Sequence, residues 1–205
     1  MDPALAQVVR NAAWWLVVGG SLGFVGAVWP PYRQWSAPLE EGLRVISAHP
    51  IGWKMIHLGF VTGIWTLVAG LSLLAWSLSG RPGVTPATVS AVLLALAALA
   101  WTADIVLRLG PTVWAADSLV ATGAVPEAFG AWRGVRGVLF AVFSVLAYLA
   151  VAGTGWAMLD AGLVSRTLGW VLVAWGLSLG FGFGYNVPVV AYIPFMVLGG
   201  FLLRG

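Results

Sequence analysis

Six long apolar segments follow one another along this chain and constrain its fold more than any other feature. A helix that crosses about 30 Å of hydrocarbon needs roughly 20 residues, because it rises about 1.5 Å per residue. A helix also satisfies its own backbone N–H and C=O groups, which lipid cannot do. We expect transmembrane helices at about residues 12–29, 51–78, 86–109, 137–159, 168–185 and 188–203. The chain is thus predicted to be all-α and polytopic, with a single integral membrane domain over residues 1–205.

The first and the sixth segments each raise a separate question. An apolar run after Arg10 is also typical of a signal peptide, but Trp-Pro-Pro follows it instead of a small-residue cleavage site, so we expect a helix. The sixth segment is short and contains Pro194. We expect it to cross a thinned region or to lie shielded among its neighbours.

The composition agrees with a protein surrounded by lipid. Only 8% of the residues are charged and 60% are hydrophobic, whereas soluble domains carry about 25% charged residues. The net charge of +3 is too small and too dispersed to favour a nucleic-acid partner. Because the chain has no cysteine, disulfides, iron–sulfur clusters and thiol catalysis are excluded.

Six crossings place both termini on the same side of the membrane, together with the tight turns at 79–85 and 160–167. The opposite side receives the connections 30–50 and 110–136 and the turn at Asn186, and we call it the loop face. The positive-inside rule gives most weight to short loops, which favours cytoplasmic termini in the cell membrane.

Both long connections are predicted to contain a short amphipathic helix. In "SAPLEEGLRVIS" one side of the helix carries Leu39, Leu43 and Ile46, and the other carries Glu40, Glu41, Arg44 and Ser47. This pattern favours a helix at the membrane interface. The alternative is a lid over a cavity. The second connection, "WAADSLVATGAVPEAFGAWRG", has a similar composition.

The two histidines, His49 and His57, lie eight residues apart around the start of the second helix. Since His49 precedes Pro50, we expect it just outside that helix. Two metal ligands on one helix are normally three or four residues apart, so we predict neither a metal site nor a cofactor. The purified protein should be colourless, and a stoichiometric Soret band would contradict this. A five-coordinate haem or a histidine–methionine pair remains the open alternative.

Several polar residues are predicted to lie at one depth near the loop face. Asp104 and Arg108 have the i, i+4 spacing of an ion pair within a helix, and His57 should lie at the depth of Asp104 on the antiparallel neighbour. One interpretation is that Asp104 is neutralised by Arg108 while the other cations extend to the interface. The other is a polar pocket that binds a ligand. The candidate ligand-binding residues are His57, Asp104, Arg108, Lys54, Arg133, Arg136, Tyr185 and Asn186.

Glycines repeat every four residues in two of the segments. Gly176, Gly180 and Gly184 form one series, and Gly19 and Gly23 form another. Small residues at this spacing let helix backbones approach closely, so we expect both faces to contact other helices. No metalloprotease, serine-hydrolase or phosphate-loop motif occurs, and we assign no catalytic residues.

The second helix opens with a Trp and a His, and the fifth starts with "LGWVLVAWGLSL". On these features the chain resembles small multi-spanning bacterial membrane proteins of unknown function. That resemblance transfers no site residues. The size, the six helices and the loop face are also similar in architecture to the substrate-binding subunits of energy-coupling vitamin transporters, although none of their motifs is present.

Three functional hypotheses follow from these features. The first is a non-enzymatic membrane protein that binds a small or lipid-like ligand, or a membrane partner, at the loop face. The second is a haem- or quinone-binding electron-transfer subunit with His57 as ligand. The third is an intramembrane enzyme with His57 as base and Asp104 as the residue that orients it.

Overall fold

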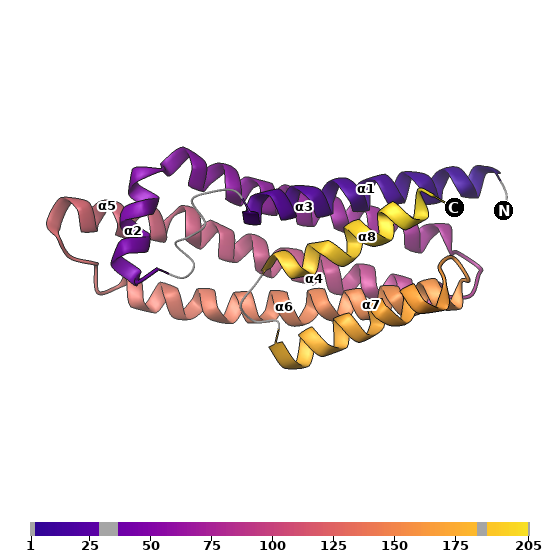
Figure 1. Cartoon of the computed structure of the whole chain (residues 1–205). Helices are drawn as coiled ribbons and strands as arrows, with labels where there is room; N and C mark the ends of the chain where they lie inside the picture. The colour runs from indigo at the N-terminus through magenta and orange to yellow at the C-terminus, as the bar shows by residue number, and fades with distance from the viewer. Residues whose placement is uncertain (1–2, 29–36, 184–187, 205) are drawn as a thin grey trace.

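The computed structural model describes residues 3–28, 37–183 and 188–204, and these form a bundle of helices (Figure 1). Helix accounts for 88% of the structure, and the described ranges contain no strand. The elements are α1 (Pro3–Val28), α2 (Leu39–Ala48), α3 (Pro50–Ser77), α4 (Val84–Leu109), α5 (Pro111–Thr122), α6 (Phe129–Asp160), α7 (Arg166–Ser178), the π-helical turn η2 (Leu179–Phe183), the 3-10 turn η4 (Pro188–Ala191) and α8 (Tyr192–Leu202).

Among the described residues, four helical stretches are long and apolar enough to cross a membrane. They are α1, α3, the stretch formed by α4 and α5, and α6. Helices α7 and α8 are also apolar, but they contain 13 and 11 residues and so span only about 20 Å and about 17 Å. The prediction of an all-helical protein is therefore confirmed, and four of its helical stretches have the length and composition that a membrane span needs.

The observed helices differ from the predicted ones most at two starts, and the predicted helices at 168–185 and 188–203 are each divided, into α7 with η2 and into η4 with α8. Helix α1 begins at Pro3 rather than at residue 12, and α6 begins at Phe129 rather than at residue 137. An apolar run marks the part of a helix that suits lipid, whereas the backbone hydrogen bonds continue into polar residues. In α8, Pro194 is the third residue, where the first turn tolerates a missing N–H.

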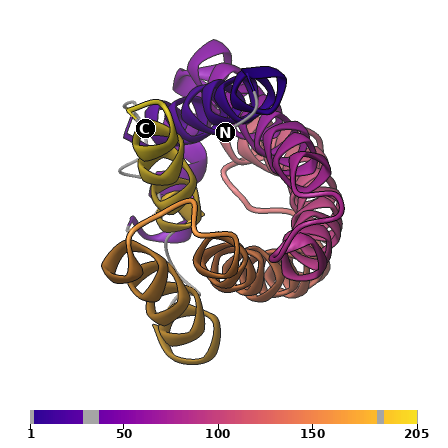
Figure 2. The ribbon, with the colours of Figure 1, turned by 90° about the vertical axis from the view of Figure 1, so that its right-hand side faces the viewer.

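Seen end-on, the helices follow one another around the bundle in the order α8, α1, α3, α4, α6, α7 (Figure 2). Each helix packs mainly along its neighbours in this order, so that α8 packs on α1 and α7 packs on α6 at the two ends of the series. Large apolar side chains from several helices fill the centre, among them Leu16, Leu67, Trp101, Phe143 and Phe195.

Close helix packing depends on glycines, as their spacing predicted. A Cβ on Gly63 of α3 would lie 2.9 Å from the carbonyl oxygen of Gly19 on α1, so neither residue has room for a side chain. Gly23 lies against the ring of Tyr192 on α8, and Gly176 lies against the backbone of α6 at Tyr148. The prediction is confirmed for Gly19, Gly23 and Gly176. A Cβ on Gly180 would lie 3.5 Å from Cβ of Tyr148 on α6, so Gly180 faces that helix at an ordinary contact distance, and Gly184 is outside the described residues.

Helices α3, α4 and α6 extend beyond the other long elements at the end of the bundle opposite the two termini (Figure 1). Helices α2 and α5 pack on each other there and form what we call the cap. Leu43 and Ile46 of α2 are buried with Ala115, Ala116 and Leu119 of α5, and Trp53 and Phe129 complete this cluster. The apolar side of α2 thus packs on protein.

Candidate functional site

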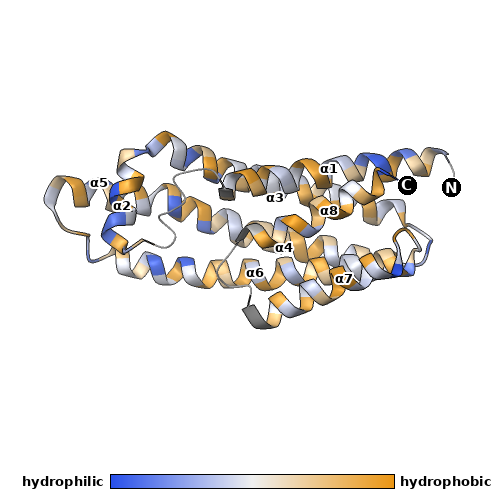
Figure 3. Ribbon diagram, viewed as in Figure 1, coloured by the Kyte–Doolittle hydropathy of each residue, from blue (hydrophilic) through white to orange (hydrophobic). Residues whose placement is uncertain are grey.

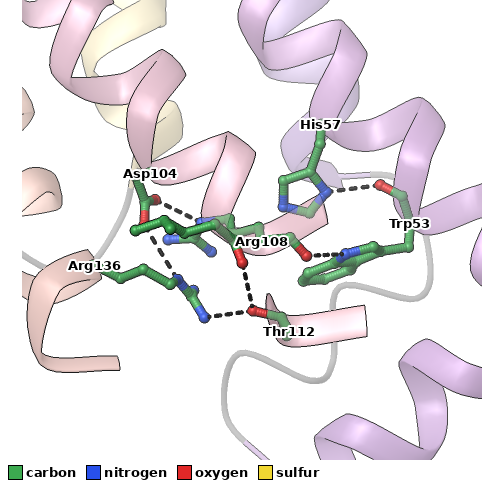
Figure 4. A network of polar contacts seen from close by, with 7 residues as sticks. Trp53, His57, Asp104, Arg108, Thr112 and Arg136 are labelled. Carbon is green, nitrogen blue, oxygen red and sulfur yellow. Dashed lines mark hydrogen bonds and ion pairs between the residues drawn. The ribbon is translucent and has the colours of Figure 1, made fainter. Parts of the chain in front are cut away.

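A buried ion-pair network lies beneath the cap, where α4 and α6 meet (Figure 4). The carboxylate of Asp104 is fully buried. Its Oδ2 accepts a hydrogen bond from Nε of Arg108 at 2.6 Å, one turn later on α4. Its Oδ1 accepts one from Nε of Arg136 on α6 at 3.2 Å. The predicted pair of Asp104 and Arg108 is confirmed, and Arg136 adds a link between two helices.

The network continues from Arg136 into the cap. Nη1 of Arg136 donates to Oγ1 of Thr112 on α5 at 3.1 Å, and Thr112 donates to the carbonyl of Leu107 at 3.2 Å. Three helices are therefore joined through polar side chains. One carboxylate faces two guanidinium groups, so the network carries an excess of positive charge.

His57 lies beside this network on α3 and is fully buried. Its Nδ1 is 2.7 Å from the carbonyl oxygen of Trp53, one turn earlier, and its ring stacks at a tilt on the indole with centroids 4.1 Å apart. Nε1 of Trp53 donates to the carbonyl of Arg108 at 3.1 Å. Figure 4 places Arg108 between His57 and Asp104, so α3 and α4 are joined here as well.

An open hollow of about 200 Å³ lies between the cap and this network. Its walls come from the start of α2, from α3, from α5 and from α6, and they combine apolar side chains with a comparable share of polar surface. Its polar groups are the two arginines of α6 and a threonine of α5. The described lining residues are Ala37, Pro38, Leu39, Gly42, Leu43, Ile46, Trp53, Thr112, Phe129, Arg133 and Arg136.

The sequence-predicted site residues divide into three groups in the structure. Arg133 and Arg136 line the hollow, whereas His57, Asp104 and Arg108 lie buried behind it and are not among its lining residues. Lys54 is exposed and also does not line it. Tyr185 and Asn186 fall outside the described residues. The described residues thus form a hollow rimmed by arginines of α6, and the ligand-binding role of the eight candidates stays a prediction.

Sequence reasoning missed Trp53, Thr112 and Phe129 as parts of this site. Trp53 is 2% exposed and Phe129 1% exposed, so both form solid walls. The amphipathic pattern of α2 was the one signal available, because it already suggested a lid. A threonine three residues after Leu109 carries no signal of its own, since its role depends on where α6 passes.

The geometry makes Asp104 the counter-charge of two arginines and argues against acid–base chemistry at this carboxylate. Both of its oxygens accept from guanidinium groups, so the carboxylate is held as a counter-charge and does not orient His57. The described residues include no group of three or more His, Asp or Glu side chains placed to hold a metal ion. Comparison of the chain with protein-family models, with curated proteins and with solved structures finds no match.

Proposed function

We propose that this protein is a six-span, non-enzymatic protein of the cell membrane that binds a small or lipid-like ligand in the hollow beneath the cap. The observation that carries the proposal is the hollow itself, because a concave site that combines apolar side chains with convergent polar groups is the usual setting of a ligand. Here the polar groups are Thr112, Arg133 and Arg136.

The distribution of charge along the long helices indicates where the hollow lies relative to the membrane. Residues 11–28, 58–77, 84–103 and 137–159 carry no charged side chain, and each stretch is close to the roughly 20 residues that cross about 30 Å of hydrocarbon. Hydropathy colouring shows the same band, with polar residues near both ends (Figure 3). The network begins where the uncharged stretches end, so the hollow faces the membrane surface.

The six-span topology is supported by where three of the helices end along the long axis of the bundle. The ends of α1, α7 and α8 that point toward the cap lie at about the same level along the bundle (Figure 1). If α1 crosses the membrane, α7 and α8 reach nearly the same depth despite their shorter lengths, as a locally thinned bilayer allows. The cap then rests at the loop-face interface, above the hydrocarbon.

A substitution that fills the hollow tests ligand binding. Ala37 lines the hollow, so we expect Ala37→Trp to fill it, while Ala124→Trp on the exposed turn after α5 is the matched control. The full chain would be offered decanoate, decanol and decyltrimethylammonium, and complexes would be detected by native mass spectrometry. We expect a one-to-one complex with at least one probe in the wild type and the control, and its loss in Ala37→Trp. If no probe binds, or if Ala37→Trp changes nothing, the proposed function is wrong.

A further inference from the structure

We propose that the hollow recognises an anion, namely the carboxylate or phosphate end of a compact amphiphile, with Arg133 and Arg136 holding the charge. This inference rests on the proposed function and deepens it, because it names the chemical class of the ligand.

The first argument is the balance of charge around the hollow. Arg108, Arg136 and Arg133 are three cations, and Asp104 is the acidic residue that pairs with two of them. The Asp104 network therefore keeps one positive charge in excess, and Arg133, which lies outside that network, adds a second at the hollow. No acidic residue occurs among the described lining residues, and Glu40 and Glu41 are on the exposed side of α2.

The second argument is the way in which Arg136 is held. Its Nε and Nη1 are bound by Asp104 and Thr112, which fixes the plane of the guanidinium. Its Nη2 has no acceptor within the part of the chain that the structure describes, and the side chain, 17% exposed, contributes to the wall of the hollow. An oriented guanidinium that still has free donors is well suited to a carboxylate or phosphate.

The third argument is that Arg133 lies one turn before Arg136 on the same face of α6. Arg133 is exposed and forms no ion pair within the described ranges, and it lines the hollow with Arg136. Two guanidinium groups one turn apart on the same helix face can both reach a single anion. Leu39 and Leu43 of α2, together with Phe129 one turn before Arg133 on α6, give the hollow apolar surface that suits the rest of an amphiphile.

The volume limits the size of the bound group. Drug-sized pockets have about 300–1,000 Å³, and a water molecule occupies about 30 Å³ in the liquid. A hollow of about 200 Å³ therefore admits an anionic head and a few methylene groups, with a longer chain leaving through the open side. The same chemistry could come from a lipid headgroup or from a small soluble anion.

Calorimetry in nanodiscs of neutral lipid tests the charge preference, with empty nanodiscs as the blank for partitioning. Decanoate and decyl phosphate should bind at least about tenfold more tightly than decanol. The hydrogen bonds that a charged head group accepts from arginine strengthen binding by about this factor. In Arg133→Gln the anions should bind about tenfold more weakly while decanol is unchanged. Lys54→Gln, which removes an exposed charge that does not line the hollow, should behave as the wild type.

The outcomes separate this inference from the proposed function. If decanol binds in the hollow as tightly as decanoate, or if Arg133→Gln leaves the anions unaffected, ligand binding stands and anion recognition is wrong. Arg133 lies outside the Asp104 network, so this variant should fold. If phosphatidic acid in the nanodisc competes with decyl phosphate, the natural ligand is a lipid headgroup. If butyl phosphate saturates the hollow and phosphatidic acid does not compete, the natural ligand is a small soluble anion. If none of the probes binds, both proposals are wrong.

Discussion

At the scale of single residues, the polar network depends on Asp104. It is fully buried and its two oxygens compensate Arg108 and Arg136, which come from different helices. Burying charge is unfavourable unless it is paired, and removing one partner of a buried pair leaves the other uncompensated. Asp104 therefore stabilises the junction of α4 and α6, in addition to any effect on the hollow.

We expect Asp104→Asn to lower the free energy of unfolding by about 3–5 kcal/mol, as for other buried ion pairs that lose one partner. Asp117→Asn is the control, because Asp117 is exposed and, among the described residues, accepts from Ser47 alone at 3.3 Å. Its effect should stay below about 1 kcal/mol. Thermal and denaturant unfolding in a mild detergent measure both. A loss for Asp104→Asn as small as that of the control would contradict a structural role for this carboxylate.

At the scale of elements, two kinds of contact hold the helices in place. Within the apolar part of the bundle, α1 and α3 approach closely through glycines. At the loop face, the cap forms because the apolar side of α2 packs on α5. Each contact makes its own prediction.

Gly63→Ala should be destabilising, whereas Gly59→Ala, one turn earlier on α3, should not. A Cβ at residue 63 would lie 2.9 Å from a backbone oxygen of α1, while at residue 59 the nearest atom would be 3.6 Å away. Overpacking costs about 1–3 kcal/mol, and an unhindered Gly→Ala change in a helix gains up to about 1 kcal/mol. The melting temperatures of the two variants should therefore move in opposite directions. Equal shifts would refute the close contact of α1 with α3.

The packing of α2 on α5 can be tested by cross-linking, since the chain has no cysteine of its own. Oγ of Ser47 lies 3.3 Å from Oδ1 of Asp117, so Ser47→Cys with Asp117→Cys should form a disulfide under mild oxidation. Ala48→Cys with Asp117→Cys is the control, because residue 48 points to another side of α2. Mass spectrometry of the linked peptide detects the bond. Cross-linking at equal rates in both pairs would mean that α2 is not held on α5.

At the scale of the whole molecule, the proposed topology places the two ends of the bundle on opposite sides of the membrane. Arg81, in the turn between α3 and α4, lies toward the termini, and Glu127 lies at the loop face; both are exposed. In intact cells, a membrane-impermeant maleimide should label Glu127→Cys, and it should label Arg81→Cys only after permeabilisation. The reverse pattern would place the termini outside, and equal labelling would contradict a spanning bundle.

Much of the fold could be predicted because it depends on local properties. The apolar runs identify the parts of the helices that suit lipid, and His49 lies between α2 and α3 as Pro50 predicted. The i, i+4 pair of Asp104 and Arg108 could also be predicted, since its two residues share a helix face. The helix ends were predicted less well, as the early start of α6 shows, because a helix continues into polar residues when hydropathy changes.

The sequence by itself therefore determined that this chain is helical and apolar through its middle, and that its polar residues gather near one level. The tertiary structure alone decided that Asp104 also pairs with Arg136, that Thr112 supports Arg136, and that the cap leaves a hollow beside them. These contacts join residues on different helices. They depend on how α4 and α6 cross and on which side of α5 packs against α2. The spacing of residues within one helix carries no information about how two helices pack on each other.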